Sequence, residues 1–367
     1  MKAVNKELGY EHWILEIDNV LSKAFLSINP KNAGSERRKF LASKKYNPVF
    51  KYSKINLEVV ESIFCTIENS LPKEGPLAEV WKDKADQTRH RIALLKSVGE
   101  EEFTKISKEL YGIPSEELVL KAQEIMNTPP PESEESTNSD EVIKVATEAL
   151  EKLGLKEWRI VEGNISANAF VLANFKRIRV RKDDAMPKNL LKRMLIHEIG
   201  THVFRAYNGS KQPSYLFETG FPNYLSTEEG LAVNMEERYG FMHGGMLKTY
   251  AGRAVAVHMA QTRSFREIFK HLRKHFSERE AWKITMRAKR GLKDTSKPGG
   301  NTKDYIYLQG YFEVKEFLEK EGDEGLRRLY RGKVGIKDLE AVEKVPGLKE
   351  PVLLPDNMIL REIMEKV

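Results

Sequence analysis

Cysteine is nearly absent from this chain of 367 residues, since the only one is Cys65 in the segment ESIFCTIENS. A lone cysteine excludes intrachain disulfides, and a zinc site would have to be built from other ligands. We expect Cys65 to act as a small hydrophobic residue on the buried face of a helix.

Long apolar runs are absent as well. The sequence contains no stretch of about 18 apolar residues, so we expect no membrane-spanning helix and no membrane partner. The segment MKAVNKELGYEHWILEIDNV carries charges every few positions and lacks the apolar core and small-residue cleavage site of a secretory signal. We therefore expect a cytoplasmic protein.

A strong excess of one charge is missing too. The formal net charge is +7, which could steer an acidic partner toward the surface only weakly. Basic residues are interspersed with acidic ones, and aromatic residues do not alternate with them as on a base-stacking surface. We expect no nucleic-acid partner.

The chain has enough apolar material for a folded protein of two lobes. Hydrophobic residues make up 40% of it, and its length exceeds that of a usual single domain. Apolar residues recur three and four positions apart through much of 1–126, which predicts an N-terminal helical lobe. The segment 127–141, NTPPPESEESTNSDE, has the composition of a linker or exposed loop. We expect a catalytic domain over 142–367.

The catalytic domain has a mixed pattern. From Phe175 to Arg181 polar and apolar residues alternate, as in a half-buried strand that could also pair with an extended substrate at a sheet edge. Apolar residues at 191, 195 and 199 then mark one face of a helix, and further helices are expected from about Thr227, Arg253 and Ser277.

The segment HEIGTH on the first of these helices suggests a metal site. His197 and His202 are five residues apart, whereas zinc peptidases commonly use a spacing of four, which puts both rings on one helix face. On a regular α-helix five residues turn the side chains about 140° apart. A π-bulge would rotate the second ring back, and Gly200 lies where that distortion is needed.

A catalytic zinc usually has three protein ligands and one open position. The third candidate is Glu229 in STEEGLA, although Ser226 and Glu229 also match a capping box in which the glutamate only caps its helix. Glu198, beside the first ligand, is the candidate general base. The alternative for the histidine pair is two hydrogen-bonded core histidines.

Other histidines are weaker candidates. His271 and His275 have the four-residue spacing but lie among Lys270, Arg273 and Lys274, so we interpret them as part of a solvated helix face. His258 lies in an apolar segment and is expected to be packed in the core. His12, His90 and His243 are isolated in the sequence.

HEIGTH, followed by Arg205, Asn208 and Gln212 and then by TEEGLA, resembles the microtubule-associated tyrosine carboxypeptidase family and its prokaryotic relatives with a QEGLA motif. INPKNAGSERRKFLASKKYNPVFKY and MRAKRGLKDTSKPGGNTKDYIYLQGY are similar to further segments of that family. The resemblance implies a zinc metallopeptidase that trims residues from protein C-termini. The expected fold is α+β, mainly helical, with a zincin-like catalytic lobe around a small sheet and an N-terminal helical lobe.

The resemblance also implies functional residues. One zinc ion per chain would be held by His197, His202 and Glu229, while Glu228 stands where relatives have glutamine and is not expected to be a ligand. Ser214 stands where we expect tryptophan in animal members, so the resemblance is not extended to tubulin as the substrate.

A carboxypeptidase needs a cation for the terminal carboxylate of its substrate. The candidates are Arg287, Arg290 and Lys303, because they lie in the C-terminal family segment, and Tyr307 could donate a hydrogen bond to the oxyanion. Each of the four could instead be a surface charge or a packed tyrosine.

The predicted function is a zinc-dependent metallocarboxypeptidase that hydrolyses the C-terminal peptide bond of a protein or peptide tail. The alternatives are a zinc endopeptidase or aminopeptidase, or a non-catalytic regulatory binding protein that retains a zinc site. Glu198 favours catalysis, since a structural zinc needs no general base and normally has four protein ligands.

Overall fold

The computed structural model of the protein describes residues 9–129, 136–163, 169–182, 186–187, 189–242 and 244–366. Its backbone forms two compact units that interleave along the sequence. Unit 1 comprises Met1–Lys73, Trp81–Pro130 and Gly244–Gln309, and unit 2 comprises Glu74–Val80, Pro131–His243 and Gly310–Val367. The division at 126 and 142 stays a prediction, and 244–309, part of the expected catalytic domain, lies in unit 1.

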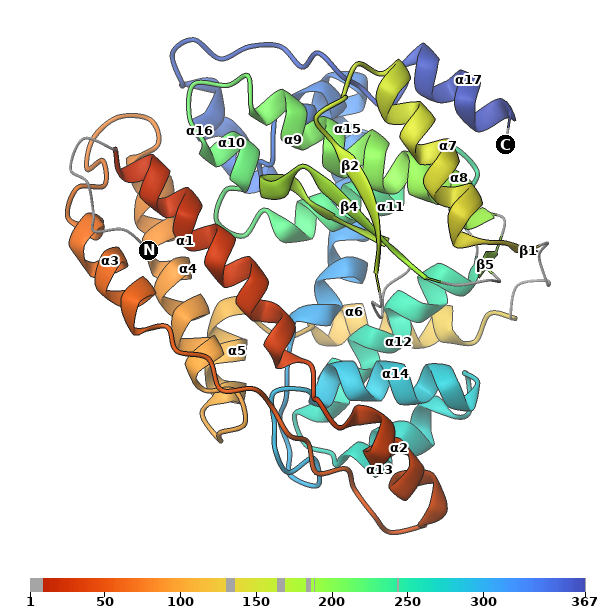
Figure 1. The fold of residues 1–367 in the computed structure, drawn as a ribbon. Helices are drawn as coiled ribbons and strands as arrows, with labels where there is room; N and C mark the ends of the chain where they lie inside the picture. The colour runs from red at the N-terminus through yellow and green to blue at the C-terminus, as the bar shows by residue number, and fades with distance from the viewer. Residues whose placement is uncertain are drawn as a thin grey trace. The chain divides into compact units, whose positions relative to one another are not determined.

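Unit 1 is helical wherever it has regular structure in the described residues (Figure 1). Within the described residues 9–126 the expected helices are confirmed, and the last of them ends at Met126. The elements of this unit, with α4 counted here because most of it lies in unit 1, are α1 (Tyr10–Ala24), η1 (Phe25–Ile28), α2 (Ala33–Ala42), α3 (Glu58–Glu68), α4 (Ala78–Lys96), α5 (Phe103–Tyr111), α6 (Glu116–Met126), α12 (Gly244–Ala260), α13 (Phe265–Leu272), α14 (Glu278–Lys289) and η4 (Lys303–Tyr305).

Local sequence explains several of these boundaries. The hydroxyls of Ser264 and Ser277 each accept a hydrogen bond from the backbone N–H of the glutamate three residues on. The carboxylate of that glutamate accepts a hydrogen bond from the backbone N–H of the serine. Helices α13 and α14 therefore both begin in capping boxes. The start expected at Ser277 is thus confirmed. The helix expected from Arg253 begins earlier, at Gly244. A cluster of Phe40, Phe50, Phe265 and Trp282 forms a core of this unit.

Unit 2 combines helices with a small sheet, so the prediction of a mainly helical α+β fold is confirmed. Its elements are β1 (Ser136–Thr137), α7 (Ser139–Lys152), β2 (Arg159–Gly163), β3 (Ala169–Leu172), η2 (Ala173–Phe175), β4 (Arg177–Arg181), β5 (Met186–Pro187), α8 (Asn189–Met194), η3 (Leu195–Val203), α9 (Phe204–Gly209), α10 (Leu216–Thr219), α11 (Leu225–Arg238), most of α15 (Ile306–Tyr330), η5 (Ile336–Asp338), α16 (Leu339–Glu343) and α17 (Met358–Lys366).

Three strands form the sheet in the order β2-β4-β3, with β2 parallel and β3 antiparallel to β4, while β1 and β5 pair antiparallel in a separate two-stranded sheet. The strand expected at 175–181 is confirmed as β4, whose Ile178 and Val180 are fully buried while Arg177 is exposed. The hypothesis that this strand offers a free edge to a substrate is wrong, because both of its edges are paired. Helix α7 packs on the sheet (Figure 1).

Two predictions about buried side chains are contradicted. The prediction for Cys65 is wrong, since α3 exposes this residue. His258 is exposed as well, so it is not a core histidine. Of the linker segment, 130–135 lie outside the described residues, as does His243. Over the described part of the chain, no helix is both long and apolar enough to cross a bilayer.

Candidate metal centre

The two motif histidines lie on a π-helix. The element η3 runs from Leu195 to Val203, a length of nine residues, and continues α8 on one side and α9 on the other. Hydrogen bonds from residue i to i+5 widen each turn, so residues five apart come to lie above one another. The rings of His197 and His202 have centroids 4.9 Å apart. The predicted π-type distortion between the histidines is therefore confirmed, and it extends well beyond a single bulge.

Gly200 fits this π-helix for reasons of packing. A Cβ at this position would lie 2.9 Å from Cδ2 of Leu360 and 3.0 Å from Cδ1 of Ile196. Its carbonyl accepts a hydrogen bond of 2.9 Å from the hydroxyl of Tyr330, and the Thr201 hydroxyl donates to the carbonyl of Ile196 at 3.0 Å. These side-chain bonds satisfy backbone groups in a stretch where the regular α-helical pattern is lost.

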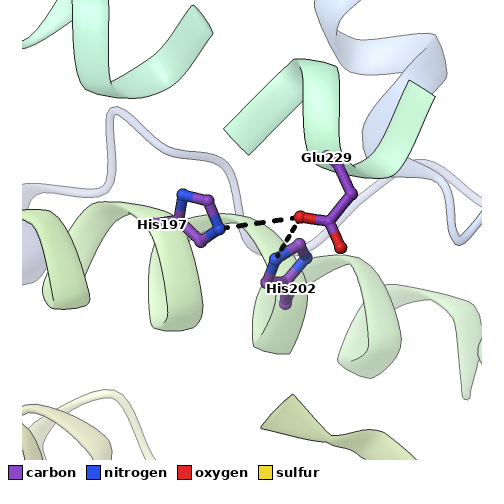
Figure 2. Close-up of side chains that lie close together, drawn as sticks. All are labelled: His197, His202 and Glu229. Carbon is purple, nitrogen blue, oxygen red and sulfur yellow. Dashed lines mark ion pairs between the residues drawn. The ribbon is translucent and has the colours of Figure 1, made fainter. Parts of the chain in front are cut away.

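Helix α11 brings the third candidate ligand to the histidines. One carboxylate oxygen of Glu229 lies 3.9 Å from Nε2 of His197 and 3.9 Å from Nε2 of His202, as Figure 2 shows. Among the described residues, these three form the one group whose ligand atoms all lie within 4.8 Å of one another. Two ligands of a tetrahedral zinc are roughly 3.4 Å apart, so side-chain shifts of about half an ångström would close this set around an ion.

Glu229 does not act as a helix cap. Helix α11 already begins at Leu225, and the Ser226 hydroxyl donates to Glu313 at 2.9 Å. The capping-box alternative is therefore wrong.

Gly230, the next residue, allows α11 to approach α15, because a Cβ there would meet the backbone of Gly310 at 2.1 Å.

Each histidine is oriented by a carboxylate on its other ring nitrogen. Nδ1 of His197 lies 2.6 Å from Glu236, and Nδ1 of His202 lies 2.9 Å from Glu228. An ionised carboxylate can only accept, so each Nδ1 donates and each Nε2 is left to face Glu229. Carboxylates in this position are typical of histidine ligands to metals.

Arginines hold both carboxylates ionised. Arg193 donates to Glu236 through Nε at 2.8 Å and Nη2 at 2.7 Å. Burial tends to raise the pKa of Glu236, but Arg193 and His197 outweigh it and lower that pKa to about 2. The same holds for Glu228, because burial opposes its ionisation while the charges of Arg205 and Lys333 lower its pKa to about 2.

The same interaction acts on His197. Burial alone would lower its pKa, but the hydrogen bond and charge of Glu236, followed by the charges of Glu198 and Glu229, raise the pKa to about 9. In the metal-free protein this imidazole therefore holds a proton at neutral pH. A metal ion bound at Nε2 has to replace that proton.

Glu198, which follows the first histidine, is a buried carboxylate. It is 8% exposed, and its Oε2 has no hydrogen-bond partner within the described residues. A buried carboxylate oxygen without a partner is costly, so it is expected where a ligand or a water completes the site. The two imidazoles and Glu229 suit a divalent metal that has nitrogen and oxygen ligands and one open position. The burial of Glu198 suits the same kind of site.

Sequence reasoning missed Glu236 and Arg193 and gave Glu228 no role. The spacing held a signal for both, because Arg193 precedes His197 by four residues and Glu236 follows Glu229 by seven, which puts each on the ligand's helix face. The role of Arg205 was also missed: it binds Glu228 and donates to the carbonyls of Leu329 and Val334.

The four predicted substrate-binding residues all lie in unit 1, whereas the metal ligands lie in unit 2. Arg287 and Arg290 both form ion pairs with the buried Asp304, and Arg287 binds it through two nitrogens. Tyr307 stacks on Tyr250 with the ring centroids 5.3 Å apart. A role of these three and of Lys303 in substrate binding stays a prediction.

The fold and this site define a class of protein: a mainly helical α+β protein in which two histidines on a π-helix and a glutamate on the following long helix could hold one metal ion. Residues 38–358 match the sequence model of the family described as "Microtubule-associated tyrosine carboxypeptidase". The chain belongs to this family.

Named relatives agree with this assignment. Microtubule-associated tyrosine carboxypeptidase 1 of Rattus norvegicus is 26% identical over 343 residues, which cover 91% of this chain and 64% of the rat protein. Its namesake from Mus musculus is 31% identical over 188 residues, covering 48% of this chain and 39% of the mouse protein. The Homo sapiens protein of that name is 36% identical over 132 residues, 34% of this chain and 27% of its own length. The chain thus spans less than two thirds of these relatives.

Proposed function

We propose that this protein is a zinc-dependent metallocarboxypeptidase that removes residues from the C-terminus of a protein or peptide tail. The observation that carries the proposal is the convergence of two Nε2 atoms on Glu229 while both Nδ1 atoms are bound to carboxylates. The relatives are named as tyrosine carboxypeptidases, which supports the exopeptidase class and makes a C-terminal tyrosine the first substrate to test.

His197, His202 and Glu229 would hold the zinc ion, one per chain. Bound there, zinc supplies Lewis acidity, which polarises the scissile carbonyl and lowers the pKa of an attacking water. The donor set fits this use, because three protein ligands leave a fourth position open.

The chain's own residues carry the proton. Glu198 has a buried carboxylate oxygen, without a hydrogen-bond partner in the described part of the chain, that can accept a proton from the attacking water. The same oxygen can then deliver the proton to the amine of the departing residue. Glu236 and Glu228 keep the imidazoles oriented during this exchange, because Arg193 and Arg205 hold them ionised.

The test compares Glu198→Gln with the wild type on a peptide that ends in a free tyrosine, with cleavage followed by mass spectrometry. The variant should retain about one zinc per chain and the wild-type thermal midpoint, yet cleave at least about a hundredfold more slowly. Glu324→Gln is the matched control, because Glu324 is exposed and its substitution removes the same charge from the same unit.

The products decide among the peptidase classes. Loss of only the last residue, and none from the C-terminal amide of the same peptide, is the result expected of a carboxypeptidase. Internal cleavage would identify an endopeptidase instead, and loss of the first residue would identify an aminopeptidase. A zinc-loaded wild type that cleaves no peptide of a broad library would make this a regulatory binding protein instead.

A further inference from the structure

Unit 1 contains a group of three arginines with too few acidic partners. Arg253 lies on α12, and Arg287 and Arg290 lie on or directly after α14. Asp304, which is 1% exposed, accepts hydrogen bonds from Arg287 and Arg290. Three guanidinium groups against one carboxylate leave this group with a formal charge of +2, and the carboxylate is already shared by two of them.

Arg253 is the member without a counter-ion. Its Nε is buried and has no hydrogen-bond partner in the described part of the chain, and the acidic group that acts on its charge there is Asp304, which bonds the other two arginines. Burial and the charge of Arg287 both lower the pKa of Arg253. The buried Nε of this guanidinium is therefore desolvated without a hydrogen bond, which is unfavourable unless a bound anion or a water completes the site.

Two aromatic rings flank this guanidinium. Its carbon Cζ lies 5.2 Å from the ring centroid of Tyr250 and 5.2 Å from that of Tyr307, and the two rings stack with an angle of 11° between their planes. The rings limit where the guanidinium can go, so its nitrogen atoms are held in place before any ligand arrives. The side chain is still partly exposed, so a ligand can reach it.

We propose that Arg253, flanked by Tyr250 and Tyr307, is a binding site for a carboxylate group of a ligand. A guanidinium can donate two parallel hydrogen bonds to the two oxygens of a carboxylate. Arg253 therefore differs from Arg287 and Arg290, each of which donates to Asp304. The carboxylate can come from the C-terminus of a peptide, from an acidic side chain or from a small free acid.

Binding tests this site without relying on peptidase activity. The parent protein is the full chain with Glu198→Gln, so that no peptide is consumed, and the probe is a fluorescent neutral hexapeptide with a free C-terminus or with a C-terminal amide. The parent should bind the free acid at least about tenfold more tightly than the amide, in line with one charge-assisted bidentate contact. Arg253→Gln should remove this preference.

Arg279→Gln is the matched control, because Arg279 is an exposed arginine on α14 and its loss changes the net charge equally. The control should keep the preference for the free acid. Equal binding of both probes by the parent, or an unchanged preference in Arg253→Gln, would overturn the proposal. Either result leaves the proposed peptidase function untouched, since zinc content and cleavage are measured separately.

A stability measurement separates a binding arginine from a structural one. Removing Arg253 breaks no hydrogen bond among the described residues and relieves repulsion by Arg287, although it loses the contacts with the two rings, so Arg253→Gln should lower the thermal midpoint less than Arg287→Gln does. Arg287→Gln should lower the midpoint, because it breaks the ion pair with buried Asp304. If both variants lose equal stability, Arg253 has a structural role and the site is refuted.

Two further probes identify the source of the carboxylate. A peptide amide with one internal aspartate binds in an Arg253-dependent way if side-chain carboxylates occupy the site. Sodium acetate displaces the free-acid peptide at low millimolar concentration if small acids are the occupants. Arg253-dependent binding of the free-acid peptide, with neither of these effects, assigns the site to peptide C-termini.

Discussion

Replacing Glu236 by glutamine should weaken zinc binding without touching a ligand. The carboxylate of Glu236 accepts two hydrogen bonds from Arg193 and binds Nδ1 of His197 at 2.6 Å. Glutamine keeps the size but removes the charge, and its amide nitrogen would face a donor. Removing such a carboxylate behind a histidine ligand typically costs 10- to 100-fold in metal affinity, or about 1.4–2.7 kcal/mol.

The assay is competition of the protein for zinc against a chromophoric chelator, at fixed pH and ionic strength. Glu237→Gln is the matched control, because the neighbouring Glu237 pairs with Lys315 and Tyr311 and contacts neither histidine. The control should bind zinc as the wild type does. If Glu236→Gln also keeps wild-type affinity, the hydrogen bond to His197 does not tune the ligand and the reasoning fails.

The pH dependence of stability gives a second measure of the same bond. His197 has its pKa raised from 6.5 to about 9 in the metal-free protein, so its contribution is complete below pH 6.5 and is lost as the pH rises through 9. The pKa of Glu236 is lowered from 4.5 to about 2, so its contribution is present above pH 4.5 and lost as the pH falls toward 2. Metal-free Glu236→Gln should therefore differ most from the wild type between pH 4.5 and 6.5, and the difference should shrink toward pH 9.

The remaining predictions concern the proton on His197 and the π-helix. Below pH 9 zinc binding should release a proton from His197, so apparent affinity should rise with pH and calorimetry in two buffers should reveal the release; an affinity independent of pH would contradict it. Gly200→Ala should cost about 1–3 kcal/mol of unfolding free energy by overpacking against Leu360, whereas Gly34→Ala, with nothing within 4 Å, should not destabilise; equal effects in chemical denaturation would contradict the packing argument. Tyr330→Phe should cost about 1–3 kcal/mol, because the carbonyl of Gly200 loses its donor, and zinc binding should weaken with it; unchanged stability would show that this bond does not support the π-helix.

The sequence predicted a candidate ligand set whose three residues the structure brings together, because the chemistry of zinc demands few residue types at short spacings. Histidines five apart with glycine between them were enough to predict a π-type distortion, which η3 shows. Glu229 could not be separated from a helix cap by spacing alone. That choice depends on where α11 begins, and Leu225 starts it before Ser226.

Other features depend on contacts between distant segments, which periodicity does not encode. The strand predicted at 175–181 was evident from the alternation, but its central place in the sheet comes from its pairing with β2 and β3. That Arg253 lacks a counter-ion among the described residues follows only from the structure, in which Asp304 is shared by Arg287 and Arg290. Cys65 and His258 were assigned to the core from apolar neighbours, yet each occupies the exposed face of its helix.

The most direct test of the metal centre is an anomalous difference map at the zinc absorption edge, from crystals of the zinc-loaded protein. One peak per chain is expected, about 2.0–2.2 Å from Nε2 of His197, Nε2 of His202 and a carboxylate oxygen of Glu229, with Glu198 outside bonding distance. A peak bound to Nδ1 of either histidine, a peak elsewhere in the chain, or direct coordination by Glu198 would contradict the proposed site.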